Sequence, residues 1–202
     1  PLRERLWTLL ESEGKTLAAL NASMFAIDLS DQVGQRILKA KRVLGARMIR
    51  SYCIAKGVAV AFNPIPVADL LAAAAIDVGM VIHLSKVYGL PLSRFEAGDL
   101  VKTIGTQLAV LMGTVWAVNL ASSAMKLGTG GLSTLLTGTA QGAVAYYSTY
   151  VVGQAAESYL SHGKSWGETG PKQVIREILD SIDRDSILAQ ARADIAGRLR
   201  SA

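Results

Sequence analysis

The sequence predicts an all-α fold of about seven helices, built around a long central antiparallel hairpin of residues 94–126 and 132–161. Two observations lead to this class. Apolar residues recur at helical spacing along nearly the whole chain. No segment alternates β-branched and polar residues between turns, as strands do. With 202 residues, of which 50% are hydrophobic and 18% charged, the chain is too apolar for an intrinsically disordered protein.

The first three predicted helices cover residues 2–28, 31–62 and 66–88. The first is an amphipathic linker helix. The second ends at a break around Asn63, Pro64 and Pro66, because asparagine is a good N-cap and proline favours the first turn of the next helix. The third ends at Gly89, with a proline two places on, which is a common helix stop.

The remaining helices are predicted at residues 94–126, 132–161, 171–182 and 184–199. Ser93 and Glu96 have the spacing of a capping box, and Asp183 is a good N-cap for the last helix. A glycine-rich turn at 127–131 separates the two hairpin helices. We expect three regions: an amphipathic linker at 1–30, a membrane-associating helical domain at 31–163, and C-terminal amphipathic helices at 164–202.

The hairpin contains two stretches without a formal charge, Thr103–Met125 and Leu127–Ala156. The shorter one would span about 35 Å as a helix, enough for a bilayer core of about 30 Å. Gly138 and Gly142 form a GxxxG pair that lets helix backbones pack closely in lipid. Both stretches are nevertheless rich in Thr, Ser, Gln, Ala and Gly, a composition that a hairpin buried in a soluble core would also have.

All seven charged residues between Asp31 and Asp69 are cations: Arg36, Lys39, Lys41, Arg42, Arg47, Arg50 and Lys56. Cations without acids next to an apolar region suit a surface that binds anionic lipid, and they place both hairpin ends on the cytoplasmic side. The alternatives are a solvated helix face or pairing with acids of another domain. Nucleic acid is disfavoured, because no aromatic residues alternate with the cations to stack bases.

The sequence offers little for catalysis or metal binding. One cysteine and two histidines do not make a transition-metal site, and we expect no metal and no cofactor. Residues 163–167 match G-x-S-x-G, but the segment before Ser165 is a predicted helix, whereas a nucleophile elbow follows a strand. Asp77 lies in the middle of an apolar helix, where a buried carboxylate needs a partner or stays protonated.

Three motifs resemble a known family: Lys56–Ala61, Asn63–Leu70 and Val87–Leu90. Thr149–Gly153 and the Gly-Lys pair after the last apolar helix also fit. The chain resembles the YcjF-like family of GTPase-associated membrane domains, domain-of-unknown-function family 697, best over residues 45–165. The resemblance implies that Asn63, Pro64, Pro66, Asp69, Tyr88 and Gly89 are helix-break and capping positions, not reactive ones.

The resemblance implies a membrane-associating helical effector or anchor domain of a GTP-binding protein, with no catalysis of its own. The expected partners are anionic lipid, a GTPase domain of the same protein, and further copies of this chain. The expected location is the cytoplasmic face of an inner or internal membrane, as an integral anchor, and the alternative is a soluble cytoplasmic protein. The chain begins at Pro1 in mid-pattern, which predicts a fragment or a processed protein. The alternative function is a soluble, self-associating all-α interaction module without lipid contact.

Overall fold

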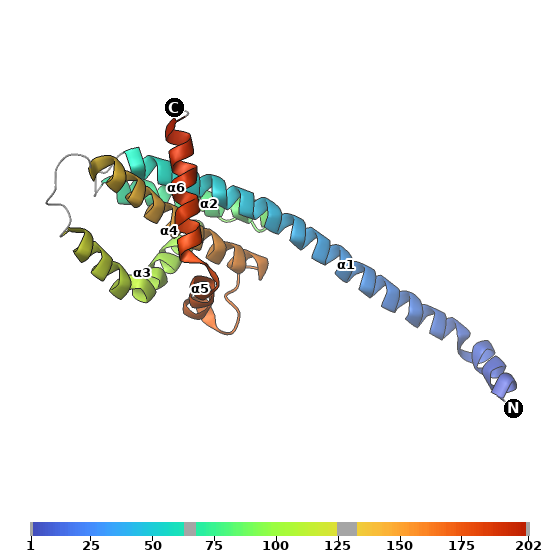
Figure 1. The fold of residues 1–202 in the computed structure, drawn as a ribbon. Coiled ribbons are helices and arrows are strands. Elements are labelled where there is room, and N and C mark those ends of the chain that lie inside the picture. Colours follow the sequence, from blue (N-terminus) through green and yellow to red (C-terminus); the bar gives the residue numbers. More distant parts are fainter. Residues whose placement is uncertain (1, 63–67, 125–132, 201–202) are drawn as a thin grey trace. The chain divides into compact units, whose positions relative to one another are not determined.

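The computed structural model describes residues 2–62, 68–124 and 133–200, and every regular element in these ranges is a helix. The six helices are α1 (Leu2–Phe62), α2 (Ala68–Tyr88), α3 (Arg94–Ala124), α4 (Ser133–Ser161), α5 (Gly170–Ser181) and α6 (Arg184–Arg200) (Figure 1). The predicted all-α class is confirmed. The described ranges hold six helices where the sequence predicted about seven.

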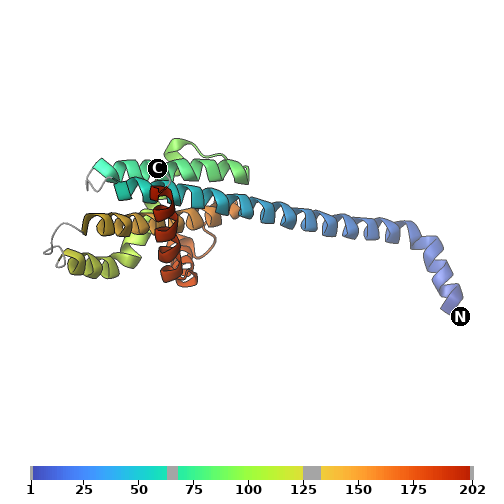
Figure 2. The same cartoon turned by 45° about the horizontal axis from the view of Figure 1, so that its top comes forward.

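The difference in number arises because the two helices predicted at 2–28 and 31–62 form one helix, α1. The predicted break contains neither glycine nor proline. Across it, Gln32 Nε2 donates to Asp28 Oδ2 at 2.9 Å, an (i, i+4) pair that supports a continuous helix. The helix also continues through Gly14, although the ribbon bends toward its N-terminal end (Figure 2).

Local capping explains where several helices begin. The predicted capping box is confirmed at α3: the Ser93 amide donates to Glu96 Oε2 at 2.8 Å, and the Glu96 amide donates to Ser93 Oγ at 3.2 Å. At α6, Asp183 Oδ1 accepts from the amides of Asp185 and Ser186 at 3.1 and 3.3 Å. These side chains satisfy backbone donors that a helix leaves open at its N-terminus.

The chain divides into two compact units, Pro1–Lys41 and Arg42–Ala202. The first unit is helix alone. In the second, α4 contacts α2, α3, α5 and α6, and both ribbon views show α6 crossing it (Figures 1 and 2). The core residues include Met80, Leu84 and Ile104, with Leu160 and Ile195 from the later helices, all at most 1% exposed. The C-terminal helices therefore pack into the second unit.

The second-unit part of α1 packs against α4 through small residues. A Cβ at Gly142 would lie 2.5 Å from the carbonyl oxygen of Gly57, so only glycine fits at this backbone contact. A Cβ at Gly153 would lie 2.7 Å from the side chain of Ile49. Gly142 thus faces another helix of its own chain. Gly138 lies in α4 but outside the residues whose surroundings are described.

Several predicted features lie outside the described residues: Asn63, Pro64 and Pro66, the turn at 127–131, and the side chain of Asp69 in α2. Helices α3 and α4 contact each other, while the hairpin turn itself stays a prediction. In the described parts of the chain, no helix combines the length and apolar character that a membrane span requires. The spanning anchor expected over residues 103–156 therefore has no support, consistent with the many polar and small residues in these helices.

Candidate functional site

The structure divides the seven predicted lipid-binding cations of α1 into two groups. Arg36 and Lys39 in the first unit, and Arg42 and Arg47 in the second, are exposed, and Lys41 is half-buried. Arg50 and Lys56 instead form ion pairs with acids of other helices. Within the second unit, Arg42 and Arg47 are therefore the cations of this set that remain on the surface without an ion pair among those described.

Lys56 lies in the core, contrary to its predicted role on a lipid-facing surface. Its Nζ donates to Asp77 Oδ2 at 2.6 Å, and the two side chains are 7% and 8% exposed. The hydroxyl of Thr149 donates to the other Asp77 oxygen at 2.9 Å. One carboxylate thus joins α1, α2 and α4. This supplies the partner that Asp77 requires, and it removes Lys56 from any headgroup contact.

Arg50 forms a second inter-helix contact, nearer the surface. Its Nη2 and Nε donate to the two oxygens of Asp194 in α6 at 2.9 and 3.3 Å, and the hydroxyl of Tyr146 in α4 donates to Asp194 Oδ2 at 3.2 Å. The hydrogen bond and charge of Asp194 raise the pKa of Arg50. Because this fork holds the guanidinium, Arg50 links helices in addition to adding charge to the surface.

Tyr88, one of the motif residues, contacts a half-buried acid. Its hydroxyl donates to Glu157 Oε1 at 2.7 Å, joining α2 to α4. Burial raises the pKa of Glu157, while the hydrogen bond from Tyr88 and the charge of Arg42 oppose that shift. A Cβ at Gly45 would lie 3.0 Å from the same carboxylate oxygen. The half-buried carboxylate of Glu157 in α4 therefore lies against both α1 and α2.

The turn between α2 and α3 explains the remaining motif residues. Gly89 has φ of 74°, the left-handed conformation that favours glycine after a helix. Ser85 Oγ accepts from the amide of Leu92 at 3.0 Å. From the far end of α4, Lys164 Nζ donates to the carbonyl of Pro91 at 3.2 Å. Through this hydrogen bond, Lys164 of the Gly-Lys pair connects the turn between α2 and α3 to the end of α4.

The G-x-S-x-G segment follows a helix, as the sequence indicated. Gly163 and Lys164 adopt positive φ values of 71° and 65°, and their amides donate to carbonyls in the last turn of α4. Ser165 Oγ accepts from the amide of Gly167 at 3.1 Å, and the ring of Trp166 lies 5.0 Å from that of Tyr159. This segment is the C-terminal cap of α4, a structural role. Among the described residues, no three His, Cys, Asp or Glu side chains are placed to hold a metal ion.

Sequence reasoning missed three residues that complete these contacts, Tyr146, Glu157 and Asp194, and it named Thr149 only as part of a family motif, not as a partner of Asp77. One signal was available. Each lies in a helix that also presents apolar residues to the core, so an acid or hydroxyl there needs a polar partner. The identity of that partner depends on tertiary contacts, which spacing along the chain does not give.

A family model described as "Domain of unknown function (DUF697)" matches residues 24–184, well over half of the chain. The searches of curated proteins and of solved structures found no match to the chain. The matched range includes Lys56, Asp77, Tyr88, Thr149 and Glu157. Asp194, the partner of Arg50, lies beyond it.

Proposed function

The chain belongs to the DUF697 family, and on that premise we propose that it is a non-catalytic helical effector or anchor module of a GTP-binding protein. In this proposal the module associates with anionic lipid at the cytoplasmic face of a membrane and needs no cofactor. The association is peripheral: the second unit stays folded, and its surface cations contact the headgroups. The link to a GTP-binding domain comes from the resemblance noted in the sequence.

The charge of α1 carries this proposal. Residues 32–62 of this helix contain cations but no acid, and Arg42 and Arg47 are exposed. Near an anionic surface each such cation contributes about 1 kcal/mol, so a few of them give reversible binding that high salt weakens. Nucleotide state would act by changing how a GTP-binding domain docks on the helices, as in other switches of this kind.

The test is co-sedimentation of the chain with vesicles that contain or lack anionic phospholipid. We expect binding only to the anionic vesicles, and we expect the Arg42→Glu/Arg47→Glu variant to lose roughly tenfold or more in affinity. The matched control is Lys102→Glu/Lys172→Glu, which makes the same charge change at exposed positions of α3 and α5. Equal binding of the two variants at low salt would contradict the proposal.

A second function is favoured by a different observation: the first unit exposes many large apolar side chains, among them Leu2, Trp7 and Phe25. These suit a self-associating helical module without lipid contact. The two functions differ in measurable ways. A self-associating module would show no preference for anionic vesicles, and its assembly would survive charge reversal at Arg42 and Arg47.

A further inference from the structure

The first unit presents a regular row of exposed apolar side chains on α1. Six of them, 50–68% exposed, define what we call the apolar stripe: Leu6, Leu10, Leu17, Leu20, Met24 and Ile27. Their separations are three or four residues, except for one seven-residue step in which Glu13 occupies the intermediate position. This is the a/d spacing of a heptad repeat, which places all six on one side of the helix.

Nothing within the first unit covers this stripe. None of the described side chains in residues 2–41 is buried. A helix of this kind is marginal in water by itself, because most helical stability in proteins comes from packing an apolar face. A heptad pattern sustained over about three repeats is typical of a helix that pairs with another helix.

We propose that the apolar stripe packs against the same stripe of a second copy of this chain, in antiparallel orientation. This interaction surface does not depend on the lipid proposal above. The charges at the two ends of the stripe select the orientation. Arg3 and Arg5 flank Glu4 at its N-terminal end, which gives this tip one net positive charge, and Asp28 and Asp31 lie at its C-terminal end. Glu11, Glu13 and Lys15 follow the N-terminal tip, and residues 16–27 carry no charge.

An antiparallel pair brings Arg3 and Arg5 of each copy close to Asp28 and Asp31 of the other. The a/d spacing fits a register in which Leu17 packs against Leu20 of the second copy and Leu10 against its Ile27. In that register Asp31 of the second copy is level with Leu6, one residue from Arg5, and Glu13 is level with Met24 of the second copy. A parallel pair would instead place Glu13 opposite Glu13, and Asp31 opposite Asp31, within the seam, which like-charge repulsion disfavours.

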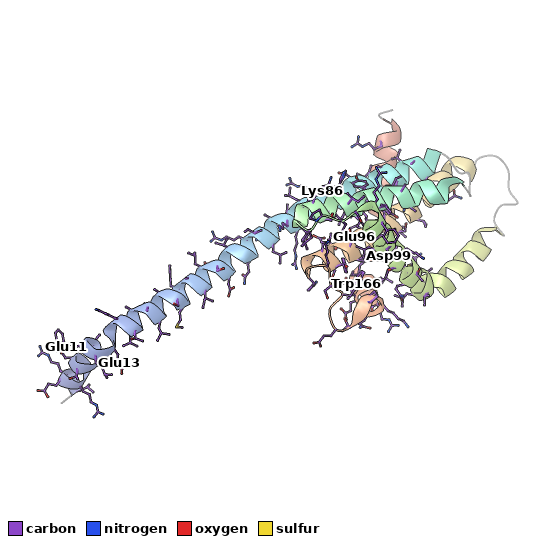
Figure 3. The ribbon with its side chains drawn as sticks, turned by 180° about the vertical axis from the view of Figure 1, so that it is seen from behind. Glu11, Glu13, Lys86, Glu96, Asp99 and Trp166 are labelled. Carbon is purple, nitrogen blue, oxygen red and sulfur yellow. The ribbon has the colours of Figure 1, made fainter. Side chains whose placement is uncertain are left out.

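The same acids argue against a lipid surface as the occupant of the stripe. Helices that lie in an anionic interface carry cations beside their apolar face. Here the heptad spacing places two acids, Glu13 and Asp31, on the stripe itself, and Figure 3 shows Glu13 on this segment of α1. Placing them against anionic headgroups would be unfavourable because the charges repel. In the antiparallel pair Asp31 lies close to Arg5 of the other copy, and Glu13 faces the uncharged side chain of Met24.

The first experiment measures the molar mass of the full 202-residue chain by sedimentation over a range of concentrations. We expect a reversible dimer. Leu17→Glu/Leu20→Glu should raise its dissociation constant by roughly a hundredfold or more, because each copy loses the centre of its seam. The matched control, Ala18→Glu/Ala22→Glu, adds the same charge on the other side of α1 and should leave the dimer intact. Circular dichroism checks that each variant stays folded.

The second experiment tests orientation. Arg3→Asp/Arg5→Asp should weaken the dimer, and adding Asp28→Arg/Asp31→Arg to the same chain should restore it. A mixture of Leu10→Cys and Ile27→Cys chains should form a disulfide between the two variants on mild oxidation, while each alone should cross-link poorly. The parent chain is the control for Cys53, which is buried.

The outcomes separate the possibilities. A chain that is monomeric at every concentration, or a dimer unaffected by Leu17→Glu/Leu20→Glu, overturns the proposal. Efficient Leu10→Cys self-cross-linking indicates a parallel pair and overturns the orientation. Vesicle binding that Leu17→Glu/Leu20→Glu abolishes, in a chain that does not dimerise, makes lipid the occupant of the stripe. None of these results changes what the Arg42→Glu/Arg47→Glu variant reports about lipid.

Discussion

The ion pair between Lys56 and Asp77 joins α1 to α2 in the core of the second unit. Both side chains are more than nine-tenths buried, and Thr149 satisfies the second carboxylate oxygen. A buried pair of this kind contributes little net stability compared with apolar residues of similar size, because desolvation offsets the attraction. Because either charge alone is costly to bury, the pair favours the one packing of α1, α2 and α4 in which Lys56 and Asp77 meet.

This reasoning predicts a strongly non-additive pair of substitutions. Lys56→Met or Asp77→Leu alone should lower the free energy of unfolding by about 3–5 kcal/mol, because each leaves one buried charge without its partner. The double variant should recover most of that loss. Chemical denaturation of the four chains measures the coupling directly.

The matched control is the pair of Arg50 with Asp194, which also begins on α1 but has a 54% exposed arginine. Arg50→Met should cost less, about 1 kcal/mol, because the guanidinium is largely exposed, while Asp194, which is 16% exposed, keeps its hydrogen bond from Tyr146. If Lys56→Met were equally mild, the lysine would not be held as a buried charge.

Glu157 predicts a pH dependence of stability. Burial raises its pKa in the folded chain above the ordinary value of 4.5, so between these two pKa values the folded state binds more protons than the unfolded state. The stability that Glu157 contributes is therefore fully present below about pH 4.5 and is lost as pH rises through the folded pKa. Relative to Glu157→Gln, the wild-type chain should become less stable over this range, as thermal unfolding at a series of pH values would show.

Glu96 provides a control of opposite sign. In the capping box, hydrogen bonds with Ser93 lower the pKa of Glu96. Its contribution is present above the ordinary pKa and is lost as pH falls through the folded pKa. The difference between wild type and Glu96→Gln should therefore shrink toward acid. The Glu157 interpretation fails if both variants change stability in the same direction.

At the residue scale, the sequence indicated which buried polar side chain needs a partner, but it did not identify that partner. It showed that Asp77 requires a neighbour, and it identified Lys56 as a cation, but for another role. Tyr88 is the last residue of α2, where a helix end was expected, and its side chain also contacts Glu157, 69 residues away, which was not expected. Such pairs depend on how helices pack, and packing is set by many weak contacts together.

At the scale of the elements, α1 and α4 meet through backbone and small side chains. The closest point is Gly142 on Gly57, where an added Cβ would lie 2.5 Å from a carbonyl oxygen. A backbone atom cannot rotate away as a side chain can. The two helices can therefore accept a methyl group at this point only by moving apart, which would weaken the packing of Ile195 beside them.

We therefore expect Gly142→Ala to destabilise the chain by about 1–3 kcal/mol, although alanine favours helix. Gly105→Ala in α3 is the control. It is also a glycine within a helix, but an added Cβ would meet nothing within 4 Å, so this variant should stabilise by about 0.5–1 kcal/mol. Denaturant midpoints compare the two. A stabilising Gly142→Ala would show that α1 and α4 approach less closely.

Helices were the most predictable elements because their signals are local. Glycine, proline and capping side chains near positions 89, 93 and 183 fixed three boundaries. The predicted break near residue 30 was wrong because serine and aspartate favour caps but also fit within a helix when no glycine or proline interrupts it. The predicted membrane hairpin is not supported by the described helices, none of which is long and apolar enough for a span. Its uncharged stretches contain many alanine, glycine and hydroxyl residues, which add length but little hydrophobicity.

At the scale of the whole molecule, the two units differ in what stabilises them. From Gly45 onward the second unit contains every buried side chain among those described. Residues 2–41 have helical backbone bonds and local pairs, such as Thr8 Oγ1 donating to the Glu4 carbonyl at 2.9 Å. A helix held only by local hydrogen bonds unfolds locally at a low free-energy cost, so its amides exchange quickly with solvent. The stability of the first unit should therefore depend on its partner, and that of the second unit on its own core.

This difference predicts the behaviour of a chain that begins at Arg42. Because no buried side chain is removed, its thermal midpoint should lie within about 4 °C of the full chain, the shift that about 1 kcal/mol produces in a domain of this size. It should lose self-association, while its preference for anionic vesicles should persist, because Arg42 and Arg47 are retained. Hydrogen exchange of the full chain at low concentration should show fast exchange in residues 2–41 and slow exchange in α4. A truncated chain that fails to fold would mean that the core of the second unit requires the N-terminal part of α1.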